Sequence, residues 1–533
     1  MSAPTVTDTS EADGRAAFAQ YETYMKRAQA ACDAGKLETA AVFAGVAAHL
    51  ALRPHAGFYF SKRLERLLAD IGKQTSPISD YRRTPEQPIR RVLHVCTEIA
   101  SVGGLYNMVR HWIDADATRA HSLALTRQRG PVVPLLLESV AKSGGRVHQL
   151  NRRMGGQIAW AQELRRLARE HDAVVLHTYS QDVIPLLAFQ KAEERSPVLL
   201  LNHGDHLFWL GATIADVVIN LRDAAQDLSI ARRAIEPRRN VMTPTIVAPK
   251  SRTHSRKEAK RLLGLAPDSV FLFSAARGMK YRSVDGVSFA DPHVDVLKAH
   301  PNAQLWVLGA GDPADWRAAS AAVEGRIKAL PESPDTALMF EAADIYVDSF
   351  PFVSSTSMME AARLGTPLVS RFYGPKEARI FAINHPGIDR ATLHASSEAE
   401  YQANLSRLIG DKTLRASMGR AAQDDVLKMH TPPSWMNYLE PAYALAQTLP
   451  PVDADAVLAS QAEETFSHGE PDRRLYEVFG ADHSWTLLAA YAPLLPFADR
   501  VAFVAALNRD GIVDARGAAR AMVPEWLVRT LKP

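Results

Sequence analysis

Apolar residues recur along this chain with two different periods. Between residues 13 and 72, alanines, leucines and aromatic residues recur at spacings of three and four, which predicts amphipathic helices. From residue 91 onward, short apolar runs such as "VLHVC", "AVVLH" and "PVLLLN" are separated by segments of helix length. Apolar strands that alternate with helices indicate a parallel sheet covered on both faces.

The alternation of strands and helices restarts near residue 245. The runs "VFLFSAA", "QLWVLGAG", "IYVDSF" and "TPLVSRF" predict the strands of a second unit of the same kind. We therefore expect the α/β class, with two tandem Rossmann-like, parallel-sheet domains and helices at both ends of the chain. The predicted parts are a disordered start at 1–12, tetratricopeptide-like helices at 13–72, a linker at 73–90, a first Rossmann-like domain at 91–245, a second at 246–448 and a helical tail at 449–533.

The first helical region contains one hairpin of the tetratricopeptide kind, around the turn "AGKLETA". A free-standing array of such repeats needs about three units. The hairpin is therefore interpreted in two ways, as a helical cap packed on the next domain or as a module that binds a partner or an acceptor.

Composition limits the classes of function. The 533 residues are 47% hydrophobic and 23% charged, as in ordinary globular proteins. The net charge of +3 comes from 62 basic and 59 acidic residues, a balance too even to favour nucleic acid as a partner. The two cysteines, Cys32 and Cys96, lack the spacing of a metal site and favour a reducing compartment. Because the N-terminus has no apolar leader and no apolar run is long enough to span a bilayer, we expect a cytoplasmic protein without an integral membrane segment.

The loop after "VFLFSAA" has the composition of a phosphate-binding loop. Two tandem parallel sheets are expected to face a cleft with the carboxyl ends of their strands, and ligands bind beside those ends. The loop contains Arg277, Gly278, Lys280 and Arg282. Its glycine lets a ligand approach the backbone and its cations neutralise charge, so the loop can hold a diphosphate. A solvated basic loop is the alternative.

Four consecutive hydroxyl residues, Ser354 to Ser357, follow the run "IYVDSF", and Glu360 comes shortly after them. If a helix begins at this run, its first N–H groups and its dipole form an anion site. The hydroxyls add donors to phosphate oxygens, and Glu360 can accept two hydroxyl groups of a ribose. The alternative is an ordinary helix cap, because Ser/Thr-x-x-Glu is also a capping-box pattern.

Taken together, these motifs resemble the C-terminal domain of glycosyltransferases with the GT-B fold. The resemblance rests on the order of the Arg277/Lys280 loop, "VLGAGD", "FEAADIYVDSFPF", the hydroxyl run and "MEAARLGTPLV". The Gly103-Gly104 loop and "LNHGDHLFWLG" resemble the N-terminal domain of the same enzymes, so the resemblance spans roughly residues 90–445. Features of two branches are present: the large retaining family that includes glycogen and sucrose synthases, and the protein O-GlcNAc transferases, which carry tetratricopeptide repeats.

The resemblance implies a glycosyltransferase that moves a hexosyl or N-acetylhexosaminyl group from a nucleotide sugar, with a UDP-sugar favoured, to a protein or saccharide acceptor. It implies no metal and no cofactor other than the nucleotide sugar, which is a co-substrate. Arg277 and Lys280 would hold the donor diphosphate. Thr356 and Ser357 would bind phosphate oxygens, and Glu360 the ribose hydroxyls. The donor-binding residues implied in this way are Gly103, Gly104, Arg277, Lys280, Ser355, Thr356, Ser357 and Glu360.

One position departs from the retaining family. The signature of that family is Glu-x7-Glu, and Phe352 stands where its first glutamate would be. The stereochemical outcome is therefore left open. An inverting reaction needs a general base on the acceptor side. The candidate catalytic residues, all at predicted strand ends of the first domain, are His203, Asp205 and Glu98, with His177 and His206 as further candidates.

Two alternatives share the predicted fold. A sugar-nucleotide 2-epimerase of the GT-B fold would use the same diphosphate site, but the helical extensions of this chain favour a transferase with a large acceptor. A GT-B-like binding or scaffold protein without catalysis is the second alternative, because the acidic residue expected at position 352 is missing.

Overall fold

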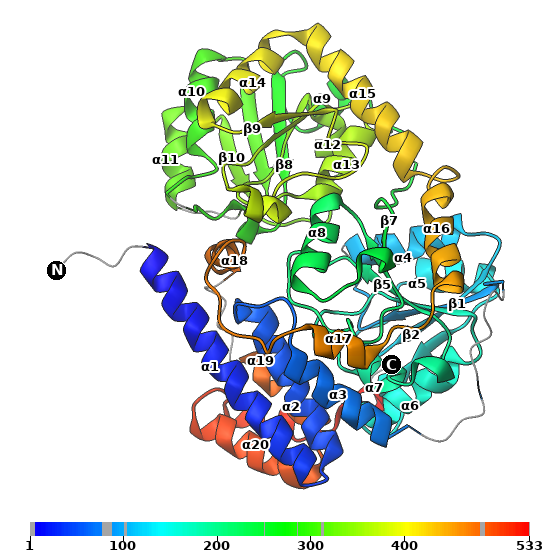
Figure 1. Ribbon diagram of the computed structural model, residues 1–533. Helices are drawn as coiled ribbons and strands as arrows, with labels where there is room; N and C mark the ends of the chain where they lie inside the picture. Colours follow the sequence, from blue (N-terminus) through cyan, green and yellow to red (C-terminus); the bar gives the residue numbers. More distant parts are fainter. Residues whose placement is uncertain are drawn as a thin grey trace. The chain divides into compact units, whose positions relative to one another are not determined.

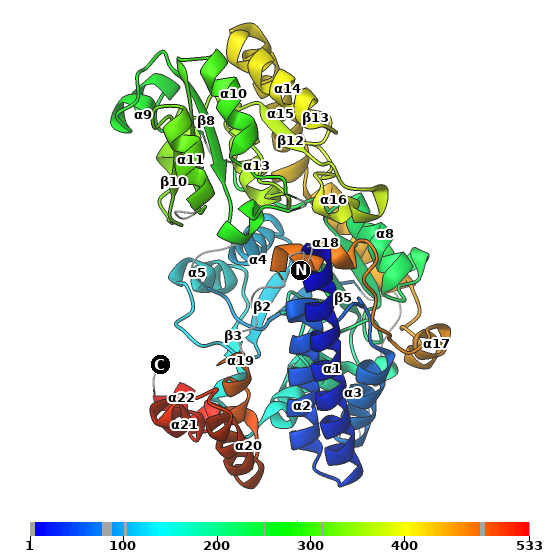
Figure 2. The ribbon, with the colours of Figure 1, turned by 90° about the vertical axis from the view of Figure 1, so that its left-hand side faces the viewer.

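The computed structural model describes residues 6–76, 81, 88–100, 104–249, 251–284, 286–310, 314–479 and 486–531 (Figures 1 and 2). The chain forms two compact units. The first comprises Met1–Asn220, Ala225–Thr243 and Leu439–Pro533, and the second comprises Leu221–Ala224 and Pro244–Tyr438. Each unit is built around one parallel sheet flanked by helices, so the predicted α/β class is confirmed.

The first unit contains a seven-stranded sheet in the order β3-β2-β1-β4-β5-β6-β7. Strands β1, β4 and β5 are buried along almost their whole length, which explains their continuous apolar sequence. The strand order reverses between β1 and β4, and parallel sheets of this kind bind ligands beside the carboxyl ends of the strands at such a point. The strands are β1 (Arg91–Cys96), β2 (Ala120–Leu125), β3 (Val147–Gln149), β4 (Ala173–Leu176), β5 (Val198–Asn202), β6 (Val217–Asn220) and β7 (Asn240–Met242).

Helices alternate with these strands in the sequence. In α6, Trp160, Ala161, Leu164 and Leu167 recur at helical spacing and bury one face in the core. The helices of this region are α4 (Gly104–Ala115), α5 (Pro134–Lys142), α6 (Gln157–Ala168), α7 (Ile184–Phe189) and α8 (Asp223–Arg232).

The N-terminal region forms helices α1 (Val6–Asp33), α2 (Leu37–Leu50) and α3 (Lys62–Gln74), which pack on the first α/β region. The buried carboxylate of Glu65 accepts hydrogen bonds from the backbone N–H groups of Gly211 and Ala212, at 2.6 and 3.1 Å. Helix α1 already begins at Val6, so residues 6–12 are helical where disorder was expected. An i,i+4 ion pair between Glu11 and Arg15 stabilises this first part of the helix.

The C-terminal helices belong to the first unit and do not form a separate domain. Their apolar residues, among them Tyr491 and Phe503, share one core with the N-terminal helices and the sheet. Arg127, just after β2, forms an ion pair of 2.7 Å with Glu525 near the end of the chain. The helices are α17 (Ala454–Ser460), α18 (Asp472–Phe479), α19 (Thr486–Ala489), α20 (Phe497–Arg509), α21 (Ala515–Ala521) and α22 (Glu525–Leu531).

The second unit contains a six-stranded parallel sheet in the order β10-β9-β8-β11-β12-β13. Helices α10 and α11 lie on one side of β8 and β9, and α12 and α13 on the other (Figure 1). The strands are β8 (Val270–Ala275), β9 (Ala303–Leu308), β10 (Ile327–Leu330), β11 (Ile345–Val347), β12 (Leu368–Arg371) and β13 (Thr392–Ala395). The helices are α9 (Arg256–Leu262), α10 (Asp291–Ala299), α11 (Ala314–Ala322), α12 (Ala337–Ala342), α13 (Ser355–Arg363), α14 (Glu398–Gly410) and α15 (Lys412–His430), with α16 (Met436–Thr448) leading back to the first unit.

Among the helices of the described ranges, none combines the length and the apolar character needed to cross a bilayer.

Candidate functional site

The Arg277/Lys280 loop and the hydroxyl run lie together at the carboxyl edge of the second sheet. The loop follows β8 and the run follows β11, and these strands are neighbours in the sheet. The ammonium group of Lys280 donates a hydrogen bond of 2.6 Å to the carbonyl oxygen of Val353, which directly precedes the hydroxyl run. The same ammonium lies 4.3 Å from the ring centroid of Phe352, a cation–π distance. Two motifs that are far apart in the sequence therefore lie side by side in the structure.

Glycines let the loops of this edge approach each other. A side chain at Gly309, after β9, would overlap the carbonyl oxygen of Ala276, and its φ of +94° is one that other residues rarely adopt. A Cβ at Gly278 would lie 3.0 Å from the Gly309 carbonyl oxygen. The close approach of these loops sets the position from which Arg277 and Lys280 project.

The hydroxyl run forms the start of helix α13. Ser354 occupies the N-cap position, but its side chain does not accept a hydrogen bond from the first turn; its hydroxyl donates to the Ser357 hydroxyl at 3.2 Å. The capping-box alternative is therefore not what the structure contains at this helix. Ser355 and Ser357 are half-buried and Thr356 is exposed. The first-turn N–H groups and these hydroxyls together form the anion-binding type of helix start.

Asp348, directly after β11, is a residue of this site that the sequence reasoning did not single out. Its side chain is buried and accepts hydrogen bonds of 2.9 Å from the Ser354 N–H and from the Ser370 hydroxyl. Burial raises the pKa of this carboxyl above its ordinary value. Asp348 thus fixes the turn that leads from β11 into α13. The sequence feature that could have identified Asp348 is an acidic residue at the end of an apolar strand, in the run "IYVDSF".

Arg277 and Glu360 differ in their ion pairs. Arg277 is exposed and forms no ion pair with the other residues that the structure describes. Glu360, in the second turn of α13, forms an ion pair with Arg363. The Glu360 carboxylate is therefore already engaged by a cation on its own helix.

Phe352 is a core residue. It is buried and packs edge-on against Phe381, with ring centroids 5.4 Å apart. Its ring also supports the Lys280 ammonium. An aromatic side chain thus fills the position where the retaining signature has a glutamate, and it positions a cation.

In the first unit, His203 lies directly after β5. Its Nε2 is 3.0 Å from the Thr178 carbonyl oxygen, so this nitrogen carries the proton and Nδ1 is an acceptor when the ring is neutral. Burial lowers the pKa of His203, which favours the neutral ring at neutral pH. Asp205 is buried, and its Oδ1 lies 3.2 Å from Nδ1 of His206, so these two side chains interact with each other.

Glu98 lies after β1, and its carboxylate accepts two hydrogen bonds from Arg129, at 2.8 and 2.5 Å. It lines a different cavity from the small one beside His203, although Tyr179 lines both. The structure therefore does not bring Glu98 and His203 into direct contact. Gly104 begins helix α4, and Gly103 lies outside the described residues.

His177, a further candidate base, is buried in a chain of imidazoles. His177 Nε2 lies 2.9 Å from His94 Nδ1, and His94 Nε2 lies 2.9 Å from His121 Nδ1. The three histidines come from or directly follow neighbouring strands, and Trp112 packs edge-on against two of them. Burial lowers the pKa of His177 to about 3 and that of His94 well below its ordinary value. The three buried rings form part of the core, and His177 is not exposed to a substrate.

No three histidine, cysteine, aspartate or glutamate side chains of the described ranges come together as metal ligands.

No protein-family model matches the chain, and no curated protein matches it. Solved structures do match. HepE from Anabaena, in complex with UDP and glucose, is 14% identical with a TM-score of 0.50, and the match covers 67% of this chain and 100% of HepE. S. aureus TarM is 10% identical with a TM-score of 0.50, over 67% of this chain and 99% of TarM. These proteins are GT-B glycosyltransferases, and the likeness, at such low identity, establishes that this chain has the GT-B fold.

Proposed function

We propose that this protein is a glycosyltransferase that uses a nucleotide-sugar donor. The observation that carries the proposal is the hydrogen bond from Lys280 to the Val353 carbonyl, because it joins a cationic loop to an anion-binding helix start at the carboxyl edge of a GT-B sheet. A diphosphate is the ligand that such a combination of cations, hydroxyls and N–H groups suits best.

In this proposal, the donor diphosphate binds between the Arg277/Lys280 loop and the start of α13. Arg277 and Lys280 supply the positive charge. Ser355, Thr356 and Ser357 supply hydroxyl and N–H donors to phosphate oxygens. Glu360 binds the ribose hydroxyls and shares its carboxylate with Arg363. No metal and no further cofactor are part of the proposed mechanism.

The proposed reaction is a glycosyl transfer. The oxygen of an acceptor hydroxyl forms a bond to the anomeric carbon of the donor sugar, and the bond from that carbon to the diphosphate oxygen breaks. The electron pair of the broken bond leaves with the nucleoside diphosphate, whose developing charge the Arg277 and Lys280 cations stabilise. The hydroxyl proton passes to a general base.

We assign the role of base to His203. Its Nε2–H is bonded to the Thr178 carbonyl, which leaves the Nδ1 lone pair to accept a proton, and its lowered pKa keeps the ring neutral. Glu98 is a weaker candidate, because its carboxylate is already engaged in an ion pair with Arg129. Since Phe352 supplies no carboxylate at the position of the retaining signature, the proposal favours direct displacement with inversion. Asp205 has a supporting role beside His203.

UDP is the proposed nucleotide, because HepE, which shares the fold, was solved with UDP and glucose. The test is a calorimetric titration of the full-length protein with UDP and GDP, followed by measurement of nucleotide release from a panel of UDP-sugars. We expect UDP to bind with a Kd below about 1 mM and UDP to be released from at least one UDP-sugar. If neither nucleotide binds at that concentration, the proposed function is wrong.

A further inference from the structure

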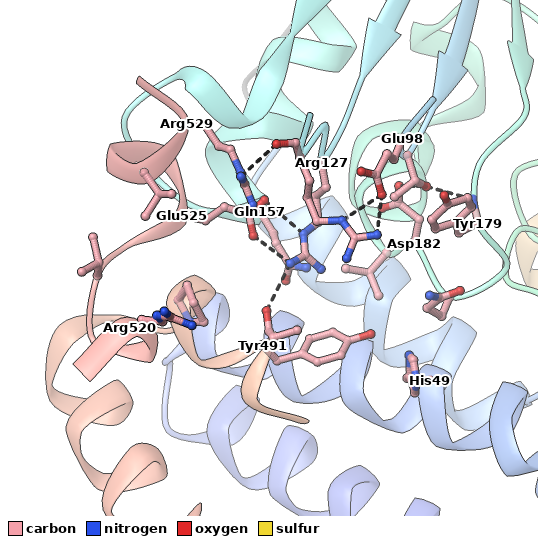
Figure 3. Close-up of a pocket in the computed structure, with 18 of the residues that line it drawn as sticks. His49, Glu98, Arg127, Gln157, Tyr179, Asp182, Tyr491, Arg520, Glu525 and Arg529 are labelled. Carbon is pink, nitrogen blue, oxygen red and sulfur yellow. Dashed lines mark hydrogen bonds and ion pairs between the residues drawn. The ribbon is translucent and has the colours of Figure 1, made fainter. Parts of the chain in front are cut away.

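The first unit contains a cavity of about 620 Å³ whose walls come from both ends of the chain (Figure 3). One wall is the carboxyl edge of the first sheet, with Glu98 after β1, Arg127 and Arg129 after β2, and Tyr179 after β4. The opposite wall is the C-terminal region from Ala490 to Leu531. Cavities of this size accommodate small molecules of one or two rings.

The C-terminal wall is fixed in place by buried polar contacts. Glu525 is 5% exposed and accepts hydrogen bonds from Arg127, at 2.7 Å, and from the Asn151 amide, at 3.0 Å. Arg529 donates to the Arg129 carbonyl oxygen at 3.0 Å. Because these contacts orient the side chains of the wall, α22 forms a built part of the cavity and not a loosely packed tail.

The charges that line the cavity do not cancel. The carboxylate of Glu98 is paired with Arg129 and that of Glu525 with Arg127. Asp182, the third acid, accepts hydrogen bonds from the Thr97 and Thr126 hydroxyls, and burial raises its pKa.

Two further arginines of the lining, Arg520 and Arg529, form no ion pair with any residue in the described ranges. The Nε of Arg529 is buried without a hydrogen-bond partner. The four arginines of the lining outnumber its three acids, even though the charge of Arg529 also acts on the Glu525 carboxylate, and this excess of positive charge favours an anionic ligand.

The rest of the lining suits a sugar ring. Tyr179, Tyr491 and Val523 present aromatic and aliphatic surfaces, and Gln157 presents an amide. Aromatic faces against the C–H face of a ring, with amides for its hydroxyls, are a common combination in saccharide sites. His49 adds a neutral hydrogen-bonding group, because burial and the nearby Arg53 and Arg127 lower its pKa to about 4.

We propose that this cavity is the acceptor site, and that it takes a sugar-sized acceptor bearing a carboxylate or a phosphate, which Arg520 and Arg529 bind. The inference rests on the proposed function and adds the class of its acceptor. Tyr179 connects the two, because it lines both this cavity and the small one beside His203. The C-terminal helices then select the acceptor.

The test uses three probes with the same ring size: glucose, glucuronic acid and glucose 6-phosphate. Each is titrated into the full-length protein, and into the variants Arg520→Gln and Arg529→Gln. Arg516→Gln is the matched control, because Arg516 is an exposed arginine of the same helix as Arg520 and does not line the cavity. We expect at least one anionic probe to bind about tenfold more tightly than glucose, and to lose about tenfold in either cavity variant but not in the control.

A further variant tests the cavity without changing an arginine. Val523→Trp, at an exposed position of the lining, should fill the cavity and abolish binding of every probe. With a UDP-sugar donor, Arg520→Gln should raise the KM of the anionic acceptor about tenfold and leave the KM of the donor unchanged. The anionic probe that binds shows whether the charge is a carboxylate or a phosphate.

Binding that does not depend on the charge of the probe, or that both arginine variants retain, would overturn the inference. UDP titrations of the same variants separate this result from a failure of the proposed function. If UDP binds and the anionic probes do not, only the acceptor assignment is wrong. If the probes bind and UDP does not, the cavity is an anion site but the glycosyltransferase proposal, and the acceptor role with it, is wrong.

Discussion

The two sheets of this protein have similar topology, but different side chains lie at and behind their carboxyl edges. In the second unit, the edge gathers a lysine and a helix start, with one buried carboxyl group, Asp348, beneath them. In the first unit, buried imidazoles lie within the sheet, and an arginine-lined cavity lies at its edge. Because the strands supply only a scaffold in both cases, the residues that follow each strand decide what the edge can bind.

Two kinds of buried ionisable group, the histidines His49 and His177 of the first unit and the carboxyl group of Asp348 in the second, respond to pH in opposite directions. A histidine buried as the neutral ring resists protonation, so its folded-state pKa is low. A carboxyl group buried like Asp348 resists ionisation, so its folded-state pKa is high. A falling pH therefore destabilises the first unit through these two histidines, and a rising pH destabilises the second unit through Asp348.

The largest effect that we expect is the loss of stability of the first unit in acid. The pKa of His49 is lowered to about 4 and that of His177 to about 3, so in the unfolded chain these rings bind protons below pH 6.5 that they cannot bind when folded. Their contribution is present above pH 6.5 and is lost as the pH falls toward the folded values. Each ring should lower the free energy of unfolding by about 2 kcal/mol at pH 5 relative to pH 7. The free energy of unfolding at the two pH values is measured by urea titration, with hydrogen exchange of the amides in β1 and β4 as the probe.

The variants His49→Gln and His177→Gln isolate the two contributions. Each should reduce the loss between pH 7 and pH 5 by about 2 kcal/mol, whatever it does to stability at pH 7. Losses as large as in the unchanged protein would show that these rings are not the groups that sense acid.

The second effect concerns the cationic loop. Lys280→Ala should weaken UDP binding by about ten- to a hundredfold, or about 1.4–2.8 kcal/mol, because a charge-assisted contact to the diphosphate is lost. Lys257→Ala is the matched control, since it removes the same charge from an exposed surface pair of the second unit. Isothermal titration of both variants measures the difference. Equal UDP affinity in the two variants would contradict the claim that Lys280, at the edge of the second sheet, binds the diphosphate.

The sequence predicts the central strands of both sheets and misses three of the four edge strands. The missed strands β7, β10 and β13 each lie at the edge of a sheet. These strands have only three or four residues and are not buried along their whole length, so they lack the continuous apolar runs of β1 or β8. An edge strand of three or four residues forms because it pairs with the neighbouring strand of the sheet. The local sequence pattern does not show this pairing.

In the candidate sites, too, the sequence predicts the features that follow one recognisable strand and misses those that depend on contacts between distant segments. The Arg277/Lys280 loop and the α13 start were predictable because each follows a recognisable strand of its own. The imidazole chain was not, since His94, His121 and His177 meet only when β2, β1 and β4 are adjacent. The arginine-lined cavity depends on the Arg127–Glu525 pair, which joins residues almost 400 positions apart, and no spacing rule predicts such a contact.

The last expected effect reverses the sign of the first. Burial raises the pKa of Asp348, so the folded second unit retains a proton that the unfolded chain releases near pH 4. Its stabilising contribution is present below the unfolded value and is lost as the pH rises through the folded value, and a pKa difference of one between the two states corresponds to about 1.4 kcal/mol. Asp348→Asn should abolish this fall, although it also loses one of the hydrogen bonds from Ser354 and Ser370. Hydrogen exchange of β11 and β12 between pH 4 and pH 7 measures it. A fall that persists in the variant would mean that the two units differ in their acid response but not through Asp348.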